Sequence, residues 1–195
     1  MSKANGAGEL GVGRDRDRHV LLIGLPGAGK SNVGRRLAKE LERPFADADE
    51  QLELTAGRTI PRLFREEGEP AFRQREMDVL ADLLARATPL VVAAGGGADV
   101  SDQVRALLTD TAVVVWLRGS REFLLSRTDP SHRPLLVDDP SGALARLDAD
   151  RAARYAEIAD HVVDIEPFQN AADKPKRAIA RHIVGLLAGD EAVLA

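Results

Sequence analysis

The sequence predicts an α/β fold in which strands and helices alternate along one domain. Three observations lead to this prediction. Short apolar runs of the kind found in buried strands recur at residues 19–23, 89–94 and 111–117. Each run is followed by a segment that is expected to be helical, and after the first run the apolar residues have helical spacing. The first run is joined to its helix by a glycine-rich loop, which is the setting of a phosphate-binding motif.

The glycine-rich loop is the most specific pattern in the chain. It runs from Gly24 to Ser31 and matches G-x-x-x-x-G-K-[ST] at every fixed position. Glycines leave backbone N–H groups open to a polyphosphate, and the helix beginning near Lys30 presents its positive end. Lys30 supplies charge for the β/γ oxygens, and Ser31 a hydroxyl for magnesium. A glycine-rich turn without a ligand is the alternative. The predicted nucleotide site comprises Gly27, Ala28, Gly29, Lys30, Ser31 and Asn32.

The composition of the chain limits the classes of protein to which it can belong. The chain has 195 residues, 44% of them hydrophobic and 30% charged, as in an ordinary globular domain. Its formal net charge of −4 argues against a general nucleic-acid binder. It has no cysteine, which excludes disulfides and thiolate metal sites. No apolar run approaches membrane-spanning length and the first 18 residues lack a signal-peptide core, so we expect a cytoplasmic protein without a membrane partner.

Three regions divide the chain. Residues 1–18 are rich in glycine and charge and are expected to form a disordered arm. Residues 19–189 are expected to form the globular domain, and residues 190–195 a short tail.

Two aspartates follow a weak strand signal at Phe45. Pro44 stops the first helix before this point. If the segment is extended, Asp47 and Asp49 point the same way. One carboxylate would then hold magnesium and the other accept a proton from an attacking hydroxyl. The alternative is an acidic turn whose aspartates cap a helix.

The remaining elements are bounded by glycine and proline. Gly57 and Gly68 end two short helices, and the strand at 89–94 runs into a triple glycine that would let a ligand approach bare backbone. Helices are expected at 50–56, 59–67, 71–85, 99–109, 120–127, 141–159 and 174–187, a last strand at 162–165, and a linker before the final helix.

Residues 128–140 are expected to form a long loop. They contain three prolines and no periodicity, and such loops often close over active sites. Arg127 and Arg133 flank its first part. In a phosphotransferase, an arginine on a closing lid supplies charge to the transferred phosphoryl group. The alternative is a surface loop with solvated arginines.

The order of these motifs resembles the shikimate kinase family of small P-loop kinases, from about residue 19 to about residue 187. The elements that carry the resemblance are Gly29-Lys30-Ser31, Asp47-x-Asp49, Gly68-Glu69 with Phe72-Arg73 and Glu76, Gly95-Gly96-Gly97, Arg127-Thr128, Arg133-Pro134-Leu135-Leu136, and Arg151 four residues before Tyr155. The resemblance implies a doubly wound sheet of five parallel strands with a lid. It implies transfer of the γ-phosphate of ATP to the 3-hydroxyl of shikimate, by a protein that we expect to be a monomer.

The resemblance also implies roles at the phosphate end of the site. Lys30 would neutralise phosphates, and Ser31 with Asp47 would hold one magnesium ion. Arg133 would reach the phosphoryl group from the lid, and Arg127 would lie against adenine.

At the substrate end, the implied roles belong to charged residues and bare backbone. Asp49 would bind the substrate hydroxyls and accept the proton. Arg73, oriented by Glu76, and Arg151 would clamp the shikimate carboxylate. Gly95, Gly96 and Gly97 would supply backbone contacts.

Two departures leave alternatives open. The family often has Arg-x-Pro-Leu-Tyr where this chain has Arg151-Ala152-Ala153-Arg154-Tyr155, so that Arg154, on the same helix face as Arg151, is an alternative clamp residue. Ala94 replaces a hydroxyl residue before the triple glycine. Two other functions stay open: a related P-loop kinase for a polyol acid such as gluconate, and a non-catalytic nucleotide-binding module.

Overall fold

A five-stranded sheet forms the centre of the molecule. We describe a computed structural model of the chain at residues 17–95, 108, 110–128 and 139–189. The strands lie in the order β2-β3-β1-β4-β5, and every neighbouring pair is parallel. The predicted five-stranded parallel sheet is therefore confirmed. The strands are β1 (His19–Ile23), β2 (Phe45–Asp47), β3 (Val91–Ala93), β4 (Ala112–Arg118) and β5 (His161–Asp164).

Helices connect the strands and closely follow the predicted boundaries. Gly57, in the left-handed conformation, ends one helix, and Gly68 (φ 78°, ψ 172°) interrupts another where a break was expected. The expected linker before the last helix contains a 3-10 helix, η3 (Glu166–Asn170), that we did not predict. The helices are α1 (Lys30–Glu40), α2 (Ala48–Ala56), α3 (Ile60–Leu84), α5 (Arg121–Ser126), α6 (Pro140–Ile158) and α7 (Pro175–Leu187).

Two predictions fall largely on residues outside the described part of the chain. These are the helix at 99–109 and the lid at 128–140. Arg18, the last residue of the expected arm, is held to the domain, because its guanidinium donates to the carbonyl oxygen of Ala112. Among the described helices, none is both long enough and apolar enough to cross a membrane.

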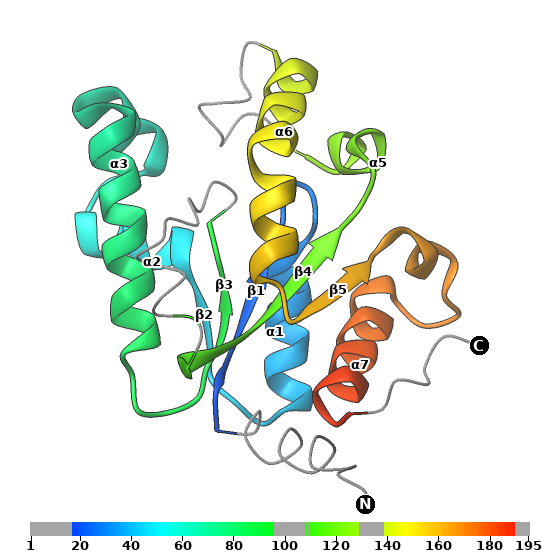
Figure 1. Cartoon of the computed structure of the whole chain (residues 1–195). Helices are drawn as coiled ribbons and strands as arrows, with labels where there is room; N and C mark the ends of the chain where they lie inside the picture. The colour runs from blue at the N-terminus through cyan, green and yellow to red at the C-terminus, as the bar shows by residue number, and fades with distance from the viewer. Residues whose placement is uncertain (1–16, 96–107, 109, 129–138, 190–195) are drawn as a thin grey trace, which may run out of the picture.

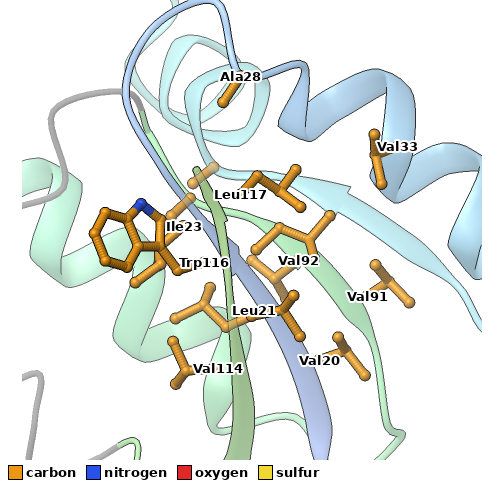
Figure 2. Close-up of a cluster of buried hydrophobic side chains, with 14 of the residues drawn as sticks. Val20, Leu21, Ile23, Ala28, Val33, Val91, Val92, Val114, Trp116 and Leu117 are labelled. Atoms are coloured by element: carbon orange, nitrogen blue, oxygen red, sulfur yellow. The ribbon is translucent and has the colours of Figure 1, made fainter. Parts of the chain in front are cut away.

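Helices cover both faces of the sheet, so the central strands are buried on both sides, as parallel strands usually are. Helices α1 and α7 pack together on one face, and α6 crosses the other face over β4. Figure 2 shows the two sets of side chains, with Val20, Val91 and Val33 on the α1 side and Ile23, Val114 and Trp116 opposite.

The strand register determines which residues lie close together at the carboxyl edge of the sheet. Asp47, the last residue of β2, pairs with Ala93 of β3, which pairs with Leu22 of β1. The phosphate loop follows β1 directly, and Gly95 lies two residues beyond Ala93. Ligands of open α/β sheets bind beyond the carboxyl ends of the strands. The predicted site residues therefore start from one edge, which is towards the top of Figure 1.

Candidate active site

The phosphate loop has an open start to its helix. Gly29 is the N-cap of α1 in the left-handed conformation (φ 80°), and no side chain caps the helix there. The first turn also carries no acidic residue. A Cβ built at Gly29 would find no atom within 4 Å. The first N–H groups of α1 and the positive helix end are thus presented to a small anion such as phosphate.

The loop also packs tightly against α5. Gly27 has a φ of 85°, and a Cβ built there would lie 2.2 Å from the carbonyl oxygen of Leu124 and 2.6 Å from Thr128 Oγ1. Thr128 itself donates a hydrogen bond to that carbonyl oxygen at 2.7 Å. Glycine at this position therefore allows the end of α5, where the predicted lid begins, to contact the loop directly.

Lys30 is buried beneath the loop. Its Nζ donates to the carbonyl oxygen of Gly24 at 2.7 Å and contacts that of Leu25 at 3.4 Å. These contacts bring its charge to the inner side of the loop. Ser31 and Asn32 follow in the first turn of α1, the first half-buried and the second exposed.

Asp47 is both the last residue of β2 and the N-cap of α2, so the strand ends there. Its Oδ1 accepts hydrogen bonds from the backbone N–H groups of Asp49 (3.0 Å) and Glu50 (3.5 Å), because α2 begins at Ala48. The prediction that an extended segment carries both aspartates is therefore wrong, and the helix-capping alternative is right for Asp47. The helix turns Asp49 away from the strand end and towards Gly95.

Asp49 and Glu76 converge on the backbone of Gly95. A Cβ built at Gly95 would lie 2.7 Å from Asp49 Oδ1 and 2.7 Å from Glu76 Oε1. The two carboxylates come from α2 and from the second half of α3, and meet at the end of β3. Only a residue without a side chain leaves room for both.

Arg73 pairs with Glu76 one helical turn away. Its Nη1 donates to Glu76 Oε2 at 2.6 Å, and its Nη2 to Glu69 Oε1 at 3.0 Å. The side chains of Arg73 and Glu76 are 15% and 9% exposed, so this pair is far less solvated than an ordinary surface pair. The contact agrees with the predicted orientation of Arg73 by Glu76.

Arg151 rather than Arg154 faces this cluster. Arg151 is half-buried on α6, forms a side-chain hydrogen bond with Tyr155 and acts electrostatically on Glu76. Arg154 is exposed. Of the two arginines left open by the sequence, Arg151 is the one whose charge acts on Glu76.

Burial raises the pKa of Glu76 above its ordinary value of 4.5. The nearby carboxylate of Asp49 raises it further, whereas Arg73 and Arg151 oppose the shift. Two acids and two guanidinium groups therefore share a partly dehydrated space beside the phosphate loop, which is the environment in which protein groups are tuned for binding or proton transfer.

Arg127 lies at the end of α5 and is held from two sides. Its guanidinium is 5.2 Å from the centroid of the Phe123 ring, and Nη1 donates to Gln169 Oε1 at 3.3 Å. Gln169 lies in η3, so sequence reasoning missed this partner together with the element. Its surroundings contain polar residues without a recognisable motif, and no local signal would have singled it out.

The residues present fit one magnesium ion held together with phosphates. Both hydrogen bonds that Asp47 accepts from described residues go to Oδ1, which leaves Oδ2 for a cation or its water. Within the described part of the chain, no three His, Cys, Asp or Glu residues form a complete metal cage. Magnesium in kinases is usually bound by one or two protein groups plus phosphates, and this pattern suits Ser31 and Asp47. The predicted residues Gly96, Gly97 and Arg133 lie outside the described residues.

The sheet order and the phosphate loop between β1 and α1 define a P-loop protein of the small-kinase type. Comparisons with known proteins narrow this class. A sequence model of the family described as shikimate kinase matches residues 26–187. This chain belongs to the shikimate kinase family, as predicted, and thus to the kinases.

Individual relatives agree with the family. The chain is similar to a shikimate kinase of Pseudomonas savastanoi pv. phaseolicola, with 42% identity over 88% of this chain and 96% of the relative. It is similar to a shikimate kinase of Caulobacter vibrioides, with 47% identity over 75% and 74% of the two chains. Among solved structures, the shikimate kinase of Acinetobacter baumannii in complex with shikimate has a TM-score of 0.81 and 36% identity, and the match covers 91% of this chain and 97% of that one.

Proposed function

We propose that this chain transfers the γ-phosphoryl group of ATP to the 3-hydroxyl of shikimate. The observation that carries the proposal is the convergence of two carboxylates, Asp49 and Glu76, on Gly95, with Arg73 bonded to Glu76 and the charge of Arg151 acting on it. A small polyhydroxylated carboxylic acid needs a receptor for its carboxylate and an acceptor for its hydroxyl proton. The planar fork of arginine is well matched to a carboxylate.

Each group then has one task. Arg73 and Arg151 bind the carboxylate of the acceptor, and Glu76 keeps the fork of Arg73 in place. Asp49 accepts the hydroxyl proton. The acceptor oxygen forms a bond to the γ-phosphorus while the bond from that phosphorus to the β–γ bridging oxygen breaks, and ADP leaves. Gly95, Gly96 and Gly97 offer backbone contacts to the acceptor.

The phosphate end neutralises charge during this transfer. Residues 27–32 bind the phosphates through backbone N–H groups and Lys30. Ser31 and Asp47 hold one magnesium ion, which supplies positive charge to the phosphate oxygens when bound. Arg133 adds charge from the lid, and Arg127 lies against adenine. One chain supplies every residue in this scheme, so we propose that it acts as a monomer. Because it consumes ATP, we propose that it works in the cytoplasm.

The experiment measures ADP release from ATP and magnesium with shikimate, with gluconate and without an acceptor. Release that depends on shikimate supports the proposal. Release that depends on gluconate supports a kinase but refutes shikimate as its acceptor. ATP binding without ADP release under any of these conditions favours a nucleotide-binding module.

Two pairs of variants test the residue roles. Asp49→Asn should nearly abolish turnover with ATP binding retained, whereas Asp82→Asn, at an exposed position on α3, should not. Arg73→Lys should raise the KM for shikimate and leave the KM for ATP unchanged, because lysine keeps the charge and loses the fork. Arg75→Lys, exposed on the same helix, is the control. An effect of Arg73→Lys on ATP alone would remove Arg73 from the acceptor site.

A further inference from the structure

Tyr155 is a fully buried polar residue whose hydroxyl the scheme above does not use. It lies on α6 with 1% of its surface exposed and is the only tyrosine in the chain. A buried phenol normally has a hydrogen-bond partner, because an unpaired polar group in the interior is costly. The identity of that partner therefore shows what the hydroxyl does.

The partner is Arg151, one turn earlier on the same helix. The two side chains form a hydrogen bond, in which the guanidinium donates to the hydroxyl oxygen. Residues four apart lie one above the other on a helix face, so the bond follows from their spacing. It directs a long side chain, which has many accessible rotamers in solution, along the face of α6.

The ring of Tyr155 is held independently of its hydroxyl. It packs edge-to-face against Trp116 of β4, with ring centroids 5.8 Å apart and planes at 63°. Trp116 pairs in register with Ile23, the last residue before the phosphate loop, and lies on the same face of the sheet (Figure 2). The position of the hydroxyl is thus fixed relative to the strand that carries the phosphate loop.

Arg151 connects this fixed point to the acceptor site. Its charge acts on Glu76. The charges of Glu76 and Arg73 in turn act on Tyr155. The guanidinium is therefore bonded to the phenol and lies close enough to Glu76 for the two charges to interact. Burial raises the pKa of Tyr155, so the hydroxyl stays neutral at neutral pH and brings no negative charge to compete with a bound carboxylate.

We propose that Tyr155 is a positioning residue, whose hydroxyl holds the Arg151 guanidinium towards Arg73 and Glu76 so that the two arginines bind one carboxylate together. This inference rests on the proposed function. Without the anchor, Arg151 would have to lose its rotamer freedom on every binding event, which weakens affinity for the acceptor without altering the phosphate end of the site.

The test compares Tyr155→Phe with Trp116→Phe. Tyr155→Phe keeps the ring and removes only the hydroxyl. It should raise the KM for shikimate about tenfold, the size expected for a lost hydrogen bond to a charged group, while kcat and the KM for ATP stay within about twofold. Trp116→Phe keeps the hydroxyl and reduces the packing of the ring. It should lower Tm, and any rise in the KM for shikimate should be clearly smaller than the rise in Tyr155→Phe, because the hydroxyl is still present.

A double variant separates positioning from general damage. In the Arg151→Ala background, Tyr155→Phe should cause no further rise in the KM for shikimate, because the group that it positions is gone. An equal rise in both backgrounds, or an unchanged KM in Tyr155→Phe alone, overturns the inference. If ADP release by the wild-type chain does not depend on shikimate, the proposed function is overturned, and this inference with it.

A probe in the unsubstituted chain keeps the test available if Tyr155→Phe does not fold. Because the chain has one tyrosine, incorporation of 3-fluorotyrosine labels Tyr155 alone. Its ¹⁹F resonance should shift on titration with shikimate, and the shift should be lost in Arg151→Ala. A resonance that does not respond to saturating shikimate, under conditions where turnover is seen, contradicts the proposal.

Discussion

Two glycines of the phosphate loop make a matched pair for testing how the loop packs. Gly27 (φ 85°) and Gly29 (φ 80°) both have left-handed backbone, and alanine at either position costs roughly 1–2 kcal/mol for that conformation. They differ in their surroundings. A Cβ at Gly29 meets nothing within 4 Å, whereas a Cβ at Gly27 would lie 2.2 Å from the carbonyl oxygen of Leu124.

The extra cost at Gly27 can be worked from this distance. Carbon and oxygen atoms in ordinary contact are more than 3 Å apart, so the backbone at Leu124 must move by about 1 Å. Overpacking of this kind costs about 1–3 kcal/mol. Backbone strain and the lower entropy of the unfolded chain affect both variants alike. Gly27→Ala should therefore be less stable than Gly29→Ala by about 1–3 kcal/mol.

Urea denaturation without nucleotide, followed by the fluorescence of the single tryptophan, measures this difference. With a slope of about 2 kcal/mol per molar urea, the two midpoints should differ by about 0.5–1.5 M. Midpoints that coincide, or a lower midpoint for Gly29→Ala, would show that the end of α5 moves aside freely and that the loop does not depend on this contact.

Three further predictions concern the carboxylate cluster and a buried histidine. Gly95→Ala should displace the carboxylates of Asp49 and Glu76 by up to about 1 Å and so lower kcat about a hundredfold. Its Tm should stay nearly unchanged, because the ends of these two side chains can rotate at little cost. A large fall in Tm would contradict this prediction. Burial raises the pKa of Glu76, so above pH 4.5 the folded chain keeps a proton that the unfolded chain releases. The free energy of unfolding of the wild type should therefore fall as the pH rises from 4.5 to the raised pKa of the folded chain. The fall should be smaller in Glu76→Gln. Burial lowers the pKa of His182 below 6.5, so the unfolded chain binds the extra proton and stability should decrease as the pH falls below 6.5. The free energies of unfolding at pH 7.5 and pH 5.5 should differ less in His182→Leu, and equal differences in variant and wild type would refute this role.

Most of the fold follows from local sequence. The central strands are buried on both sides and therefore appear as continuous apolar runs, which a single pass along the chain detects. The helix end at Gly57 and the break at Gly68 follow because glycine adopts a positive φ at little cost. The 3-10 helix η3 was missed because its five residues, Glu166–Asn170, are too short to show a period.

The aspartates show where local reasoning fails. The sequence correctly placed Asp47 at the end of a strand. It did not decide whether the chain continues extended or begins a helix, because aspartate suits both situations. The structure begins α2 at Ala48, which makes Asp47 a cap and turns Asp49 towards Gly95.

The sequence by itself determined the phosphate loop, the alternation of strands and helices, and the family. Each of these depends on residues that are close along the chain, where spacing alone fixes geometry. Only the tertiary structure decided that the charge of Arg151 acts on Glu76 while Arg154 is exposed, and that Tyr155 is buried where it bonds to Arg151. The first of these interactions acts between α3 and α6. It depends on how two helices rotate about their axes when they pack, and that rotation is set by the whole core rather than by either helix.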